Sequence, residues 1–382
     1  MKQATIKLSA IVLLLAGLTS AAQAQTNAVN VVTTAVPFLR ISPDSRSGGM
    51  GDVGIAISAD ANSSFWNLGK TPFASQKSSV SLNYTPWLSD LKLNDVYYVT
   101  LAGYHQLDET QAISGSLRYF SMGTIQFTDA DGRSLGDYRP REFSLDAGYS
   151  RKLSKKMGLG IALRYINSSL AKGTIGTSTT TYKAGTSVAG DIHFFYNGTN
   201  ASGNGFDYGA TLSNLGSKIS YTSDANQKDY IPANLGLGIA YNKVFDADSK
   251  ITFALDLNKL LVPTPPVKGD LADDVYAQNV KDYHTKSVVS SWFSSLGDGD
   301  DAKEVTVALG AEYWYKNQFA FRAGYFSENK LKGDRKYFTL GAGLKYSTYG
   351  LNFSYLLPSG SGISRSPLSN TLRFSLMFDL GK

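Results

Sequence analysis

Hydrophobic and polar residues alternate along most of the chain, from about residue 79 to its last residues. Residues 143–150 read Phe-Ser-Leu-Asp-Ala-Gly-Tyr-Ser, and residues 251–258 read Ile-Thr-Phe-Ala-Leu-Asp-Leu-Asn. Successive side chains of a strand point to opposite faces, so this period of two indicates strands with one apolar and one polar face. The pattern predicts about 14 strands, centred near residues 82, 100, 117, 146, 162, 191, 210, 238, 255, 310, 323, 341, 354 and 375.

Charged residues in these strands keep to the polar face, as at Arg118, Arg164 and Glu312. Alternation alone also fits a soluble sandwich, whose apolar face turns inward. A charge facing lipid would cost about 2–4 kcal/mol at the bilayer midplane, and Tyr residues recur at strand ends, as an interfacial girdle requires. The expected fold class is therefore all-β: a transmembrane antiparallel β-barrel spanning residues 79–382.

The first 24 residues have the features of a secretory signal peptide. Lys2 and Lys7 precede an apolar run over residues 8–18, and Ala22-Gln23-Ala24 gives a small-x-small cleavage site. The run is too short to cross about 30 Å of hydrocarbon as an anchor. Cleavage after Ala24 would leave a protein that works outside the cytoplasm, in the outer membrane.

Composition narrows the function further. The 382 residues include no cysteine, which excludes disulfides, thiol nucleophiles and a lipoprotein anchor. The net charge of +6 is not clustered, so nucleic acid is not an expected partner. Outer-membrane lipid is an expected partner.

Connections between the predicted strands alternate between short and long. This is typical of periplasmic turns and external loops, and an even number of strands puts both chain ends on the periplasmic side. The longest external loop covers residues 261–304.

Residues 25–78 do not alternate and contain a glycine-rich motif: Arg46, Gly48, Gly49, Met50, Gly51 and Asp52. No Lys-Ser/Thr follows, so a phosphate-binding P-loop is not indicated. Glycine allows close approach of backbones. We expect this segment to form a plug in or under the lumen.

Candidate chemistry is sparse, and no enzyme, cofactor or metal is expected. His193 beside Asp191 could be imagined in a Ser-His-Asp hydrolase, but a luminal polar network is the favoured interpretation. Asp298, Asp300, Asp301 and Glu304 lack EF-hand spacing, so a solvated acidic loop is favoured over a calcium site.

Loop 261–304 is the strongest candidate for binding a partner. Three prolines stiffen its start, and near-helical apolar spacing predicts a short helix within Val275 to Leu296. An exposed aromatic and aliphatic surface there would suit partner docking; the alternative is a lid over the barrel mouth. The candidate contact residues are Pro263, Pro265, Pro266, Tyr276, Tyr283, Val289, Trp292 and Phe293.

Several stretches together resemble the PorV family of the type IX secretion system, which is related to FadL transporters. They are residues 36–52, Asp60-Ala61-Asn62 to Trp66-Asn67, Asn214-Leu215-Gly216, residues 231–235 and residues 256–266. Relatives often read Asn-Pro-Ala where this chain has Asn67-Leu68-Gly69, which leaves the local conformation of the plug open.

The resemblance implies a FadL-like barrel of 14 strands with a luminal N-terminal segment. It further implies capture of cargo by a C-terminal signal domain at the SprA-type translocon barrel. Delivery to a surface attachment complex with a PorU-type sortase would follow. The alternatives are FadL-like uptake of hydrophobic small molecules and a passive porin.

Overall fold

The computed structural model describes residues 30–88, 91–93, 95–129, 131–174, 180–223, 228–297, 301–357, 368 and 370–381. The expected signal peptide, residues 1–24, lies outside these ranges. Among the helices in them, none combines the length and apolar character needed to cross a membrane.

Fourteen antiparallel strands close into a barrel in which β1 is hydrogen-bonded to β18. The barrel strands are β1 (Ser78–Pro86), β2 (Val96–Gln106), β3 (Gln111–Met122), β6 (Arg141–Lys152), β7 (Met157–Ser169), β10 (Gly185–Asn197), β11 (Gly205–Gly216), β12 (Asn234–Val244), β13 (Ser249–Leu260), β14 (Thr306–Tyr315), β15 (Phe319–Ser327), β16 (Lys336–Tyr346), β17 (Tyr349–Leu356) and β18 (Leu372–Leu380). Each sequence-predicted centre falls within one of them. The predicted strand number and barrel fold are confirmed.

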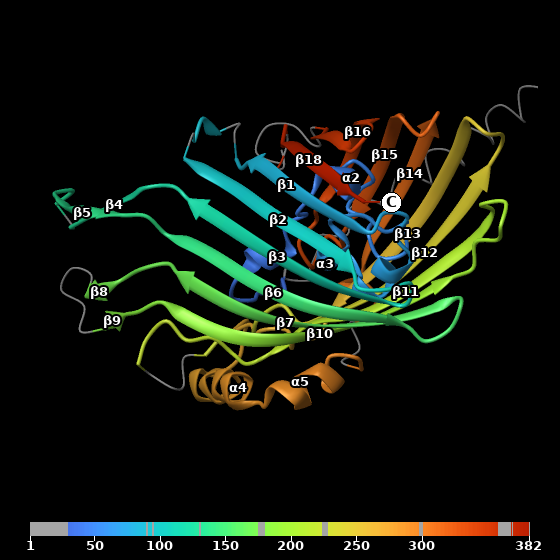
Figure 1. Ribbon diagram of the computed structural model, residues 1–382. Coiled ribbons are helices and arrows are strands. Elements are labelled where there is room, and N and C mark those ends of the chain that lie inside the picture. Colours follow the sequence, from blue (N-terminus) through green and yellow to red (C-terminus); the bar gives the residue numbers. More distant parts are fainter. Residues whose placement is uncertain are drawn as a thin grey trace, which may run out of the picture.

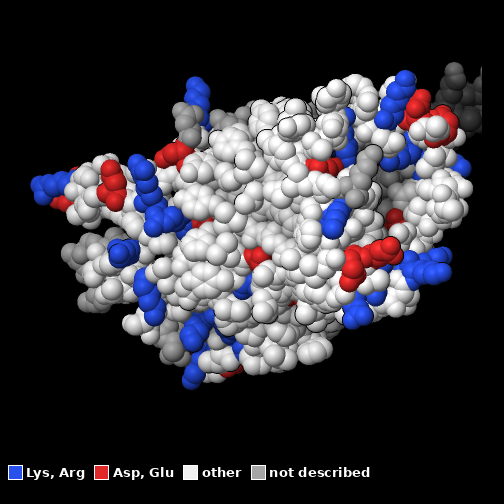
Figure 2. Space-filling model, viewed as in Figure 1, with Lys and Arg blue, Asp and Glu red and all other residues white. Residues whose placement is uncertain are grey.

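The two faces of the strands are inverted relative to a water-soluble protein. On β7, Leu163 is 69% exposed whereas its neighbour Arg164 is 3% exposed, and on β15 Phe321 is 60% exposed whereas Arg322 is 4% exposed. Figure 2 shows charged residues gathered towards the two ends of the strands, with a nearly uncharged band between them. Apolar side chains therefore face lipid, and charged side chains face the lumen.

Long connections lie at one end of the barrel and carry the additional elements, as in Figure 1. Two hairpins extend this end: β4 (Ile125–Thr128) with β5 (Ser134–Tyr138), and β8 (Gly173–Thr174) with β9 (Thr181–Tyr182). We call this the external end.

Loop 261–304 contains α4 (Asp273–Thr285), α5 (Val288–Ser294) and α6 (Asp301–Glu304), and α4 and α5 lie outside the cylinder of strands (Figure 1). The predicted helix is thus split in two. The chain is non-helical at Lys286 and Ser287, and the Ser287 hydroxyl caps α5 by accepting from the Ser290 N–H.

Residues 30–77 run through the lumen, and we call them the plug. They contain η2 (Pro37–Arg40), α2 (Ser45–Gly48), α3 (Ser63–Trp66) and η3 (Leu68–Phe73). At the external end the Asn30 N–H donates to the Leu331 carbonyl at 3.0 Å, and at the periplasmic end the Gln106 amide donates to the Ala74 carbonyl at 3.0 Å.

The expectation that both chain ends lie on the periplasmic side is wrong for the described start of the chain. Leu380, opposite Ser78, lies at the end of the barrel away from the long connections. The first described residue, Asn30, lies at the external end because the plug crosses the lumen before β1 begins.

Candidate functional site

A shared carboxylate holds the plug to the barrel wall. Arg46 of α2 donates to both carboxylate oxygens of Glu312 on β14, at 2.9 and 2.7 Å. Arg322 of β15 donates to the same carboxylate at 2.7 Å, and Asp60 pairs with Arg46 at 2.9 Å. All these side chains are largely buried, so the contact is an ionic link inside the barrel.

The glycine motif packs directly on wall strands. Gly48 lies against Arg373 and Gly49 against Gly341. Gly51 has φ of +72°, and a Cβ at Gly324 would lie 2.0 Å from the Gly51 nitrogen. Only glycine at both positions allows two backbones to approach this closely.

Met50 and Asp52 complete the motif in different ways. Met50 is fully buried in a cluster with Phe326 and Tyr337. The Tyr337 hydroxyl donates to the Asp52 carboxylate at 2.5 Å. Each residue of the predicted plug motif therefore contacts the barrel wall or the rest of the plug.

Trp66 and Asn67 connect parts of the plug that are distant in sequence. The Trp66 indole N–H donates to Asp44 at 2.7 Å, and Asp44 also caps α2. Burial, with the neighbouring charge of Asp60, raises the pKa of Asp44. The Asn67 amide donates to the carbonyls of Ile55 and of Phe194 on β10.

Sequence reasoning missed two further anchors. Asp256 of β13 accepts from the backbone N–H groups of Gly54 and Ile55 at 2.7 and 2.9 Å. Lys70 of η3 donates to the Gly54 carbonyl at 2.6 Å, and burial lowers its pKa to about 8. The polar face of β13 identified Asp256 as luminal, but no local pattern indicated its partner.

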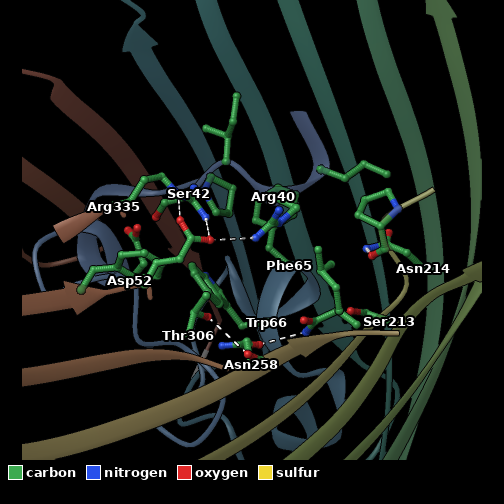
Figure 3. Close-up of a pocket in the computed structure, with 18 of the residues that line it drawn as sticks. Arg40, Ser42, Asp52, Phe65, Trp66, Ser213, Asn214, Asn258, Thr306 and Arg335 are labelled. Carbon is green, nitrogen blue, oxygen red and sulfur yellow. Dashed lines mark hydrogen bonds and ion pairs between the residues drawn. The ribbon is translucent and has the colours of Figure 1, made fainter. Parts of the chain in front are cut away.

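The plug divides the luminal space into cavities. On the external side lies a cavity of about 170 Å³, which we call the external cavity. Two neighbouring cavities of about 420 and 400 Å³ lie towards the periplasmic end, and Lys250 and Trp314 line both. Figure 3 shows the external cavity between plug residues Arg40, Ser42, Phe65 and Trp66 and wall residues Ser213, Asn214, Asn258 and Thr306.

Loop 261–304 is fixed to the barrel mouth through the end of α4. The rings of Tyr283 and Tyr230 meet edge to face at 5.4 Å, within a cluster that includes Leu260 and Val262. Lys218 donates to the carbonyls of His284 and Lys286, both at 2.8 Å. Burial raises the pKa of Tyr283 to about 12.

The candidate contact residues of this loop differ in exposure. Val289 and Phe293 are 56% and 73% exposed on α5. Tyr276, Trp292, Pro263, Pro265 and Pro266 are half-buried, and the Pro265 carbonyl accepts from the Asn30 amide. We call the exposed apolar side chains of the loop the loop patch: Val267, Leu271, Val275, Val289, Phe293 and Leu296.

The acidic residues near the end of the loop do not form one solvated tip. Glu304 is only 7% exposed and bridges Lys259 and Lys332, each at 2.8 Å, while Thr264 donates to it at 2.7 Å. That expectation is wrong for Glu304, because the chain folds back at α6 to begin β14. Asp298 and Asp300 lie outside the described residues.

The chemistry of the other candidates is limited. His193 faces the lumen 3.8 Å from Asp191, and neither ring nitrogen has a hydrogen-bond partner among the described residues. Within the same ranges there is no cluster of three side chains of the types that hold a metal.

Comparisons with known proteins agree with this architecture. Similar solved structures include a mutant of the monoaromatic hydrocarbon channel TodX (11% identity, TM-score 0.53, 88% of this chain and 99% of that one) and the Ralstonia pickettii toluene transporter TbuX (10%, 0.51, 88% and 97%). A Pseudomonas aeruginosa FadL homologue is also similar (11%, 0.47, 92% and 100%). At these identities the likeness to TodX and TbuX shows the fold alone.

No curated protein matches the chain. A family profile described as "Type IX secretion system protein PorV" matches residues 23–267, which is more than half of the chain. The chain therefore belongs to the PorV family of type IX secretion system proteins, and it is an outer-membrane β-barrel.

Proposed function

We propose that this protein captures cargo by its C-terminal signal domain at an SprA-type translocon barrel and delivers it to an attachment complex containing a PorU-type sortase. The observation that carries the proposal is the match to the PorV family over residues 23–267. Two features of the structure support a role in handling proteins outside the barrel rather than passing molecules through it.

The first supporting feature is the plug. It is fixed by the Arg46–Glu312 link and by close glycine contacts, and it leaves separate cavities at the two ends. A passive porin would need an open bore. A firmly seated plug favours a barrel that acts as a platform.

The second supporting feature is the loop patch. Val289 and Phe293 are one helical turn apart on α5, so they project from the same side. Their exposure, beside a loop base anchored by Tyr230 and Lys218, presents an apolar surface on a fixed support. Such surfaces are typical of protein-binding sites. We propose that the loop patch, with Trp292 and Tyr276 beside it, contacts cargo or the translocon.

The test replaces Val289 and Phe293 together with Asp in cells that secrete cargo. Cargo should accumulate in the periplasm while the barrel still shows a heat-modifiable band on gels. Ser290→Asp, an exposed polar position on the same helix, is the matched control and should secrete normally. Deleting residues 270–300 should give the stronger form of the same defect, and normal secretion by that deletion variant would refute the proposal.

The second candidate is transport of hydrophobic small molecules. The fold it shares with TodX and TbuX favours this alternative, since those proteins are described as a hydrocarbon channel and a toluene transporter. The external cavity argues against a path for hydrophobic molecules through the lumen, because charged side chains line it. These are Arg40, Asp52, Arg118, Glu328 and Arg335. Toluene uptake by liposomes containing the protein, above that of empty liposomes, would favour transport.

A further inference from the structure

We propose that the external cavity is a binding site for a carboxylate group presented from outside the cell. The cavity lies in the outer half of the barrel, since its lining includes the external strand ends at Leu260, Asn234 and Thr306. Plug residues Phe65 and Trp66 also line it (Figure 3). The proposal is independent of the proposed cargo role.

Positive charge is in excess around this cavity. Glu328 is shared by two guanidinium groups, those of Arg335 at 2.8 and 3.0 Å and Arg40 at 3.8 Å. Glu304 is shared in the same way by the amines of Lys259 and Lys332. Glu328 therefore neutralises one of its two guanidinium groups, and this cluster keeps one net positive charge.

Arg118 adds a cation that lacks a carboxylate partner. It is 3% exposed and lines the cavity; its Nη1 donates to the Leu39 carbonyl at 3.1 Å, and its guanidinium lies 4.9 Å from the Phe65 ring centre. Its Nε has no hydrogen-bond partner, and no ion pair among the described residues includes it. A neighbouring charged cluster, Arg164 with Asp146 and Asp191, satisfies its own members and has one more carboxylate than cation.

The extra negative charge of that cluster compensates the positive charge of Arg118 at longer range. The cluster accepts no hydrogen bond from Arg118, so within the described part of the chain the Arg118 Nε–H remains without an acceptor. A buried donor without an acceptor is costly, and a carboxylate matches a guanidinium better than any neutral acceptor does. Ser42 adds a second unsatisfied donor, since its hydroxyl is buried at the same cavity without a partner. A carboxylate in the external cavity would accept from both.

The remaining lining defines what the carboxylate is attached to. Phe65, Trp66, Phe326 and Tyr337 contribute aromatic surface, so a short apolar or aromatic group beside the carboxylate fits. The small volume, about 170 Å³, excludes a long acyl chain in full. Two sources share this chemistry: the carboxyl end of a polypeptide and a small organic acid.

The test titrates the detergent-purified full-length barrel by calorimetry with 3-phenylpropionate, with Gly-Gly-Phe, and with the amide of each. The carboxylates should bind about tenfold more tightly than the amides, and added salt should weaken them. Binding of the peptide alone would assign the site to polypeptide ends, and binding of the acid alone would assign it to small acids. Equal affinity for acid and amide, or no carboxylate binding, overturns the proposal.

Variants connect the binding to the named residues. Arg118→Gln should weaken carboxylate binding about tenfold, and Arg40→Gln, which changes a less buried lining residue, should weaken it about threefold. Lys250→Gln, at the periplasmic cavities, is the control and should bind as the unchanged protein does. Unchanged affinity in Arg118→Gln refutes the assignment; if that variant does not fold, unchanged affinity in Arg40→Gln does so.

Discussion

Replacing Glu312 with Gln tests how firmly the plug is held to the barrel wall. The side chain of Glu312 is 2% exposed and accepts from Arg46 and Arg322. Removing one partner of a buried ion pair costs about 3–5 kcal/mol. Arg46 keeps Asp60 at 2.9 Å and Arg322 keeps Asn352 at 2.9 Å, so we expect a loss of about 3 kcal/mol, at the lower end.

The assay is urea unfolding in detergent, with tryptophan fluorescence as the signal. Trp66 lies in the plug and Trp314 lies near Arg322, so both report on this region. Asp379→Asn is the control: its pair with Lys345 is partly exposed, so it should lose at most about 1 kcal/mol. Conductance of Glu312→Gln in planar bilayers should rise as the plug loosens. A variant within about 0.5 kcal/mol of the unchanged protein, with no added conductance, would show that the ionic link does not hold the plug.

Three further predictions concern the plug and the external loop. Gly324→Ala places a methyl group against the Gly51 backbone and should abolish the heat-modifiable band on gels, whereas Gly297→Ala, in open space, should leave it unchanged. Burial opposes ionisation of Glu304, but hydrogen bonds from Lys259, Lys332 and Thr264 outweigh burial and hold its pKa below the usual 4.5. A lowered pKa stabilises the folded loop above pH 4.5, and this stabilisation is lost as the pH falls through the folded pKa. Amide hydrogen exchange in the loop, corrected for intrinsic rates, should therefore accelerate over that acidic range. Glu304→Gln should remove this pH dependence. Tyr230→Ala removes the ring that Tyr283 contacts, so α4 should become protease-sensitive while the barrel stays folded, and unchanged cleavage would refute the anchoring.

The strands were predictable because lipid and lumen impose opposite demands on alternate residues. Leu163 and Arg164 are adjacent in sequence yet face different solvents, so the pattern of the chain alone assigns each to its face. The alternation of short and long connections was predictable for the same local reason. The contact of Arg46 with Glu312 was not predictable, since the two are 266 residues apart and alternation specifies a face but not a height or a partner.

In the external loop, too, the local structure was predictable from the sequence and the contacts with distant residues were not. Apolar spacing predicts helix within Val275 to Leu296, but it does not indicate the break at Lys286 and Ser287, where the Ser287 hydroxyl caps α5. The acidic local sequence around Glu304 indicates a solvated side chain. Its burial results from Lys259 and Lys332, which reach it from β13 and from the loop between β15 and β16.

The most direct test of a barrel that handles cargo at its external loop is purification of the tagged protein from membranes in mild detergent, followed by identification of what co-purifies. We expect secreted proteins that share a C-terminal domain. Their recovery should fall in the Val289→Asp, Phe293→Asp double variant and persist in Ser290→Asp. Recovery of bound hydrophobic small molecules without such proteins would contradict it.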